Sequence, residues 1–358
     1  MAEELDIQVL HEFVPMARAA LSPAHWDYLM GAADTETSYR RNRQALDSVA
    51  FRPRVLRDVS KIDSGGALLG HRLRLPVLMA PIGSLQDFTA DGSLAPARAA
   101  AAFGTMSVLS STCKPGLEEV AAATDAPMIY QLYVRDDLAS VEDRISRAID
   151  AGYAAFCFTV DLDYYGRRER DLAKRHLTSS RKTASGEHYQ AAFSWKEIDY
   201  IRGKYDIPLV LKGIATAEDA AMAVARGIDV VYASNHGGRQ LDHGRGGLET
   251  LPEIVNAVDG RAQVVFDGGI MRGTDVVKAM ALGADAVGIG RLQGLAAAAA
   301  GQRGIFRALE LLETEVRIAL GLLGVTSFAE LDASYLHAAA PVVPPGPFSA
   351  FPLLDEGY

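Results

Sequence analysis

The sequence is poor in cysteine: it has only two, Cys113 and Cys157, and neither lies in a metal-ligand or CxxC spacing. A disulfide framework needs several paired cysteines, and a structural zinc site needs clustered Cys or His ligands. Both are therefore excluded as the basis of this fold. We expect the two thiols to be buried packing groups, and the sequence predicts no metal site.

Positive charge and long apolar runs are scarce too. Lys and Arg number 36 against 45 Asp and Glu, which gives a formal net charge of -9 at pH 7. Nucleic-acid binding needs concentrated positive charge, so we expect no nucleic-acid partner and favour small-molecule chemistry. No apolar run approaches the roughly 18 residues that cross a bilayer, and the start, MAEELDIQVLHEF, is acidic where a signal peptide is basic. We therefore expect a cytoplasmic protein with no membrane partner.

Eight short apolar runs are present between residues 76 and 291, most of them separated by helix-like stretches. Continuous apolar strands that alternate with helices predict a parallel sheet covered on both faces. Eight such units favour an α/β protein with a (β/α)8 TIM barrel over an open, doubly wound sheet. The runs are PVLMAP, MSVLSS, PMIYQLY, AAFCFTVD, PLVLKG, DVVYASN, QVVFDGG and DAVGIGR.

Predicted helix ends support this alternation of strands and helices. Three Ala-rich stretches end at Gly152, Gly227 and Gly283 just before a strand, and glycine is the usual helix stop because it tolerates positive φ. Thr216, followed by acidic residues, predicts a helix N-cap.

We expect a single domain over residues 1–358, with the barrel over about 76–325. A helical segment precedes it, with a hairpin-like stretch near GALLGHRLRL. The last 20 or so residues are rich in proline, and they could pack on the barrel, join an oligomer interface or stay loose. The long gap between Asp161 and Pro208 could form a mobile lid.

Polar residues follow the C-terminal end of each of the eight apolar runs. In barrel enzymes the active site lies at these strand ends. Packing alone does not explain them, because each buried polar group needs a partner. Glycines and an arginine after the last two strands predict a phosphate site. No GxGxxG or Walker loop is present to suggest NAD or ATP. The residues in strand order are Pro81 with Gly83, Ser110, Gln131 with Tyr133, Thr159 with Asp161, Lys212, Ser234 to His236, Asp267 to Gly269, and Gly290 with Arg291.

Four long motifs carry a family resemblance: SNHGGRQLD at 234–242, TVDLDYYGRRERD at 159–171, LKGIATAEDA at 211–220 and FDGGIMRGTD at 266–275. They closely resemble the FMN-dependent 2-hydroxy acid oxidases and dehydrogenases, which include glycolate, lactate and mandelate enzymes. The likeness runs from about Tyr28 to about residue 335. It implies bound FMN, a small 2-hydroxy acid substrate and a homo-oligomer, a tetramer in the family.

The resemblance also implies a set of site residues, each at a matching motif position. The implied catalytic set is Tyr28, Tyr133, Asp161, Arg168, Lys212, His236 and Arg239, of which Tyr28, Tyr133, Arg168, His236 and Arg239 would bind substrate. The implied flavin contacts are Pro81, Gly83, Ser110, Gln131, Thr159, Lys212, Ser234, Asp267, Gly268, Gly269, Gly290 and Arg291.

The residue types suit oxidation of a 2-hydroxy acid. His236 would be the base, because the ordinary histidine pKa of about 6.5 lies near working pH. Asp161 would orient the imidazole and stabilise its charged form. The planar forks of Arg168 and Arg239 would hold the substrate carboxylate. Lys212 would lie beside the flavin edge that gains negative charge on reduction. Hydride transfer and a carbanion route both stay open.

The sequence departs from the family pattern at several points. Thr112 stands where glycolate-type members often carry a bulky aromatic, and the stretch between Arg168 and Trp195 is shorter than many lids. Both favour a larger or carrier-bound substrate. Met271 stands where an arginine usually helps to hold the cofactor phosphate, so we expect weaker or rearranged phosphate binding. Gly83 replaces an alanine common in members that react readily with oxygen, which leaves the electron acceptor open.

Two other functions compete with this one. An FMN-dependent tailoring enzyme would act on a larger biosynthetic intermediate, such as an aryl hydroxy acid or a modified peptide. A non-enzymatic flavin binder is disfavoured by the complete set of base, acid partner and paired arginines.

Overall fold

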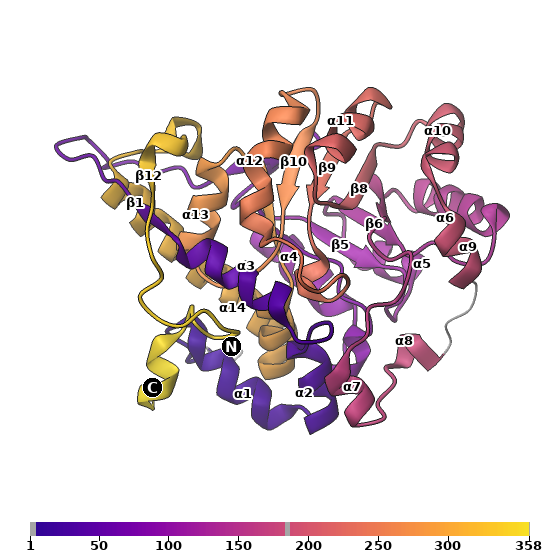
Figure 1. The fold of residues 1–358 in the computed structure, drawn as a ribbon, viewed down its shortest axis with the longest axis horizontal. Helices are drawn as coiled ribbons and strands as arrows, with labels where there is room; N and C mark the ends of the chain where they lie inside the picture. Colours follow the sequence, from indigo (N-terminus) through magenta and orange to yellow (C-terminus); the bar gives the residue numbers. More distant parts are fainter. Residues whose placement is uncertain (1–4, 183–186, 358) are drawn as a thin grey trace.

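A closed barrel of eight parallel strands forms the centre of the computed structural model, which describes residues 5–182 and 187–357 (Figure 1). The strand order around the barrel is β10-β11-β4-β5-β6-β7-β8-β9. Each of the eight apolar runs contains one strand, so the expected TIM barrel is confirmed. The strands are β4 (Val77–Met79), β5 (Ser107–Ser110), β6 (Met128–Leu132), β7 (Ala155–Thr159), β8 (Leu209–Ile214), β9 (Val230–Ala233), β10 (Gln263–Phe266) and β11 (Ala286–Ile289).

Neighbouring residues of a barrel strand pack into two different hydrophobic clusters. In β7, Ala155 and Cys157 belong to a small cluster inside the barrel, whereas Phe156 and Phe158 belong to the large cluster between strands and helices. This is the period of two that a strand buried on both faces requires. Both cysteines are free and buried, as expected.

Helices cover the outside of the barrel. Gly152, Gly227 and Gly283 have φ values of 78°, 69° and 98°, which confirms them as helix stops. Thr216 accepts a hydrogen bond of 3.2 Å from the backbone N of Asp219, the predicted N-cap. The helices are α4 (Leu94–Phe103), α5 (Leu117–Ala121), α6 (Leu138–Asp150), α10 (Trp195–Lys204), α11 (Ala217–Ala225), α12 (Gly247–Val258), α13 (Gly273–Ala281) and α14 (Arg291–Leu323).

Three further segments frame the barrel. The first is N-terminal, with η1 (Leu10–Glu12), α1 (Phe13–Ala20), α2 (Pro23–Met30), α3 (Thr37–Asp47) and β1 (Val49–Phe51). The second is the hairpin of β2 (Gly66–Leu68) and β3 (His71–Leu73), whose Leu68 and Leu73 pack in the cluster inside the barrel. The third is the predicted lid, with α7 (Glu169–Ala173), α8 (Ser179–Lys182) and α9 (Glu187–Ala192); its residues 183–186 lie outside the described part.

Short 3-10 helices complete the chain, together with β12 (Leu336–Ala338), which pairs antiparallel with β1. The 3-10 helices are η2 (Leu85–Asp87), η3 (His236–Gly238), η4 (Phe328–Glu330), η5 (Ala333–Tyr335) and η6 (Pro352–Glu356). In residues 5–182 and 187–357, no helix has the length and apolar character needed to cross a membrane.

The proline-rich tail packs on the protein, the first of the three options left open by the sequence. Figure 1 shows it in yellow beside α1. Phe348 stacks on Trp26 with ring centroids 6.2 Å apart. Phe351 is buried between His11 and Arg272, whose guanidinium lies 5.8 Å from its ring centroid. The tail therefore joins the N-terminal helices to the barrel.

We expect Phe351→Ala to lower the free energy of unfolding by about 3 kcal/mol, because it removes a fully buried aromatic ring. Leu353→Ala is the matched control, since Leu353 lies on the same tail but is 44% exposed. It should change the free energy by less than about 0.5 kcal/mol. Urea denaturation of the flavin-loaded protein measures both, and equal losses would show that the tail does not pack as a core element.

Candidate active site

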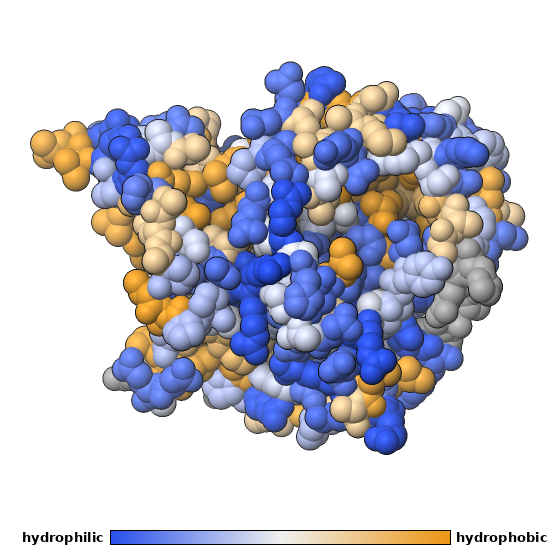
Figure 2. Space-filling view, in the orientation of Figure 1, coloured by the Kyte–Doolittle hydropathy of each residue, from blue (hydrophilic) through white to orange (hydrophobic). Residues whose placement is uncertain are grey.

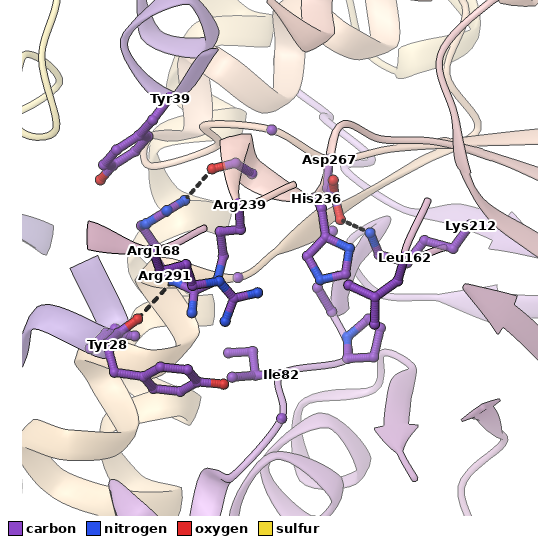
Figure 3. Close-up of a pocket in the computed structure, with 18 of the residues that line it drawn as sticks. Tyr28, Tyr39, Ile82, Leu162, Arg168, Lys212, His236, Arg239, Asp267 and Arg291 are labelled. Carbon is purple, nitrogen blue, oxygen red and sulfur yellow. Dashed lines mark hydrogen bonds and ion pairs between the residues drawn. The ribbon is translucent and has the colours of Figure 1, made fainter. Parts of the chain in front are cut away.

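A cavity of about 1200 Å³, open to solvent, lies at the C-terminal ends of the barrel strands (Figure 3). Most of the predicted site residues line it, including Tyr28, which lies on α2 outside the barrel. The singled-out residues that line it are Tyr28, Pro81, Gly83, Tyr133, Arg168, Lys212, His236, Arg239, Asp267, Gly268, Gly269, Gly290 and Arg291. The other five, Ser110, Gln131, Thr159, Asp161 and Ser234, sit at the strand ends beside it without lining it.

His236 lies between an acid and a phenol. Its Nδ1 is 2.9 Å from Oδ1 of Asp161, and its Nε2 is 3.4 Å from the hydroxyl of Tyr133. An ionised Asp161 accepts the proton of Nδ1, which leaves the lone pair of neutral His236 on Nε2. Nε2 is thus the atom available to accept a proton.

Backbone conformation fixes the direction of this imidazole. His236, Gly237 and Gly238 have φ values of 55°, 64° and 75°, so three consecutive residues are left-handed. The backbone N of His236 donates to Oγ of Ser234 at 3.0 Å. A Cβ at Gly238 would come within 2.6 Å of the backbone N of Tyr39, so only glycine lets α3 approach this turn.

Gly213 makes room for the acid partner. A Cβ at this position would lie 2.7 Å from the side chain of Asp161, and φ is 113°. The strand pairing of β8 also shifts register here, between Lys212 and Ile214. A bulge with glycine therefore places Asp161 behind His236.

Burial sets the charge states of the pair. Burial lowers the pKa of His236 below 6.5, although the charge of Asp161 opposes the change. Burial raises the pKa of Asp161, but the charge and hydrogen bond of His236 outweigh it, so the net direction is down. At neutral pH, His236 is therefore neutral beside an ionised Asp161, as a general base requires.

Two arginines approach the cavity around Tyr28. Nη1 of Arg239 donates to the backbone oxygens of Tyr28 at 2.7 Å and Gly31 at 2.8 Å, which fixes the guanidinium plane. The guanidinium carbons of Arg239 and Arg168 lie 4.7 and 5.9 Å from the Tyr28 ring centroid. Burial and the charge of Arg168 lower the pKa of Arg239 to about 10. Such a site favours an anionic ligand.

Lys212 lies on the opposite side of His236 from these arginines in Figure 3. Its Nζ donates to Oγ of Ser234 at 2.6 Å and pairs with Asp267 at 3.0 Å. Burial favours the neutral amine, but Asp267 and Asp161 outweigh it and raise the pKa of Lys212. A permanent cation thus lies at the ends of β8 and β10.

The polar groups around this cation fit a flavin mononucleotide. Gln131 donates to Thr159 at 2.8 Å, but its buried Oε1 has no hydrogen-bond partner among the described residues. Gly268 and Gly269 have φ values of 130° and 95°, and Gly290 precedes the N-terminus of α14. The unpartnered amide oxygen of Gln131 could accept a hydrogen bond from a heterocycle. Glycine loops at a helix N-terminus can bind a phosphate through their backbone N–H groups.

Arg291 lines the cavity and also binds the backbone, so its contact with the cofactor stays a prediction. Its Nη1 and Nη2 donate to the backbone oxygens of Gly237 and Gly31 at 2.9 and 2.8 Å, while its buried Nε has no partner among the described residues. Arg272 does not replace the arginine missing at Met271, because it pairs with Glu315 at 2.8 Å and does not line the cavity. Met271 does line it, so rearranged phosphate binding stays a prediction.

Sequence reasoning missed several further polar residues that line this cavity, among them Tyr39, Arg43, Arg135, Tyr165 and Arg181. Tyr165 and Arg181 lie in the predicted lid, where residue spacing gives no signal of side-chain direction. The second tyrosine of DLDYYGRR was the one available hint.

Together the fold and cavity define a (β/α)8-barrel oxidoreductase with places for a phosphorylated cofactor and an anionic substrate. The family model described as FMN-dependent dehydrogenase matches residues 17–338, and the chain belongs to this family. FMN is accordingly its cofactor.

Curated relatives and solved structures agree. The L-lactate oxidase of Nostoc sp. is 39% identical, over 92% of this chain and 97% of its own. Glycolate oxidase 1 of Zea mays is 37% identical, over 92% and 96%. A crystal structure of mandelate oxidase with benzoyl-formic acid superposes with a TM-score of 0.87 at 40% identity, over 94% and 99% of the two chains.

Proposed function

We propose that the protein oxidises the 2-hydroxyl group of a 2-hydroxy carboxylic acid to a 2-oxo acid. The observation that carries the proposal is the arrangement of His236, with Asp161 on Nδ1 and with Nε2 directed to a cavity that Arg168 and Arg239 also line. Such a site can bind an anion and accept a proton from it in one place. The family relatives are oxidases of lactate, glycolate and mandelate, which are acids of this kind.

The arginines orient the substrate. Nη1 of Arg239 is engaged by two backbone oxygens, and Nη1 of Arg168 donates to the hydroxyl of Tyr165. These contacts fix both guanidinium planes before substrate binds, so their remaining donors can hold a carboxylate at low entropic cost. Tyr28 and Tyr133 supply hydroxyls to the carboxylate and the reacting oxygen.

Oxidation removes two electrons and two protons from the substrate. FMN, when bound, would accept the two electrons and one of the two protons. Nε2 of His236 takes one proton, and Asp161 stabilises the imidazolium that forms. Lys212 keeps positive charge at the ends of β8 and β10, where it would stabilise negative charge gained by the cofactor.

Anaerobic titration with 2-hydroxy acids of increasing size tests the proposal. We expect at least one acid to bleach the bound FMN, while the matching 2-hydroxy amide fails because it offers no charge to Arg168 and Arg239. Large acids that bleach where small ones do not would favour the tailoring enzyme, which Thr112 on the cavity wall supports. Bleaching by no 2-hydroxy acid of any size would contradict the proposal.

Gly83 bears on the electron acceptor, and a side chain at this position would compete with Thr112 for space. A Cβ at Gly83 would lie 2.7 Å from Oγ1 of Thr112, which is held at 3.0 Å from Oγ of Ser110. We expect Gly83→Ala to lower kcat/KM by ~10-fold through overpacking, but by less than ~2-fold in a Thr112→Ala background. Assays with oxygen and with an artificial acceptor measure all four proteins. Additive effects would mean that the two positions do not interact.

The chain also works as a homo-oligomer in this proposal. Leu56 is fully exposed, Leu322 is 73% exposed, and the backbone N of Arg54 donates to the oxygen of Leu323, so the two lie near one another. Figure 2 shows an apolar cluster on the protruding loop at that end. Exposed apolar patches mark interaction sites. Light scattering tests the oligomeric state; a cytoplasmic location stays a prediction.

A further inference from the structure

The cavity has a second group of cations on its lid side. Arg181, on α8, and Arg135, after β6, line the same cavity as Arg168 and Arg239. Arg181 and Arg135 are half-buried, whereas Arg168 is buried. These two residues are thus nearer to solvent than the arginine expected to hold the substrate carboxylate.

Tyr165 links the two groups. The guanidinium carbon of Arg181 lies 3.5 Å from the Tyr165 ring centroid, and that of Arg168 lies 4.2 Å from the same centroid. Nη1 of Arg168 also donates to the Tyr165 hydroxyl. Both guanidinium groups therefore lie against the same ring. A guanidinium stacked on a ring keeps its N–H groups at its edge, where an anion can reach them.

The cavity wall carries more positively charged than negatively charged side chains. Asp267 is the one acidic side chain among the described residues that line the cavity, and Lys212 pairs with it. Arg43, a further lining cation, pairs with Asp47 and Asp275. The wall also presents Arg135, Arg168, Arg181, Arg239 and Arg291, so the phosphate of FMN and a single substrate carboxylate together carry fewer negative charges than the wall has arginines.

Repulsion between Arg168 and Arg239 favours an anion between them. Like charges a few ångströms apart are costly in a partly buried site unless an anion lies between them. The lowered pKa of Arg239 has the charge of Arg168 as one of its causes. The first carboxylate of the substrate would relieve this repulsion, which leaves Arg181, beside Tyr165, as a cation for a second negative group.

We propose that Arg181, stacked on Tyr165, forms a second anion subsite that binds a distal carboxylate on the substrate side chain. The preferred substrates are then 2-hydroxy dicarboxylic acids. The inference rests on the proposed function, because the first carboxylate is the one that Arg168 and Arg239 hold for oxidation. Arg181 is a specificity residue in this account and takes no part in proton transfer.

Pairs of acids of equal chain length test the subsite. Malate with 2-hydroxybutyrate, and 2-hydroxyglutarate with 2-hydroxyvalerate, differ mainly in the distal charge. We expect the dicarboxylate to reduce the flavin anaerobically with at least ~10-fold higher efficiency, about the effect of one charge-assisted hydrogen bond. Arg181→Gln should remove most of this preference and leave the monocarboxylates within ~2-fold. Arg181→Lys should restore part of it.

Lys182→Gln is the matched control, because Lys182 is the exposed neighbour on the same short helix and does not line the cavity. It should leave the preference intact. Calorimetry with 2-oxoglutarate and 2-oxovalerate measures binding without turnover, and Arg181→Gln should weaken only the first, by ~10-fold.

Each outcome separates the two proposals. If monocarboxylates bleach the flavin but the distal carboxylate gives no gain, the subsite is wrong and the proposed function stands. Equal loss for both classes in Arg181→Gln would instead show that Arg181 only holds the lid. If neither class bleaches the flavin but larger 2-hydroxy acids do, the subsite is wrong and the proposed function stands; if no 2-hydroxy acid bleaches it, the proposed function itself fails.

Discussion

His236→Ala should lose ~10²-fold or more in the rate of flavin reduction while it keeps bound FMN. The variant removes the one nitrogen, Nε2, that faces the cavity as a proton acceptor, whereas Asp161 and the arginines stay in place. The cofactor loops of β10 and β11 do not depend on the imidazole. Rapid mixing with substrate under anaerobic conditions measures the rate, and the visible flavin spectrum measures FMN content.

His243→Ala is the control for this change, since the side chain of His243 is 67% exposed and outside the cavity. It should reduce flavin at the rate of the unmodified protein. An unchanged rate in His236→Ala, with full FMN content, would show that another group is the base.

Asp161→Asn should lower the limiting rate of flavin reduction by ~10²-fold, because the imidazolium loses its ionised partner. The variant should also shift the pH profile. His236 must be neutral to accept a proton, so the rate rises as pH passes its pKa, and burial places that pKa below 6.5. Since the charge of Asp161 raises the pKa of His236, removing it should move the acid limb to still lower pH.

Asp163→Asn provides the comparison, because Asp163 is exposed and two residues away on the same loop. Its acid limb and limiting rate should match those of the unmodified protein. The limiting rate is measured at saturating substrate. The acid limb is read from the second-order rate constant at low substrate, which reports the free protein, from pH 5 to pH 9, a range that brackets the ordinary histidine pKa of about 6.5. A limb that moves to higher pH in Asp161→Asn would contradict the assigned charge states.

The barrel could be predicted from sequence because its signals are local. Each strand is a short apolar run buried on both faces, and glycines such as Gly152 and Gly227 end the preceding helices with positive φ. Active-site residues follow the strands, so their order in the chain predicted that Lys212, His236 and Asp267 would meet. Tyr28 came from the family resemblance rather than from any spacing.

Other features depend on contacts between distant segments, which a spacing pattern does not contain. The direction of Arg291 is set by carbonyls of Gly237 and Gly31, which come from a 3-10 turn and the end of α2. The space for Asp161 is set by a bulge at Gly213. The sequence of the lid has no regular hydrophobic period, so the stacking of Arg181 on Tyr165 could not be predicted.

The most direct test of the account is a single anaerobic turnover in which both products are counted. Purified protein is mixed with its best 2-hydroxy acid, and the loss of oxidised flavin is compared with the amount of 2-oxo acid released. The account predicts one 2-oxo acid for each FMN reduced, and no 2-oxo acid on the same timescale from His236→Ala. A colourless protein, or flavin bleaching without any 2-oxo acid, would contradict it.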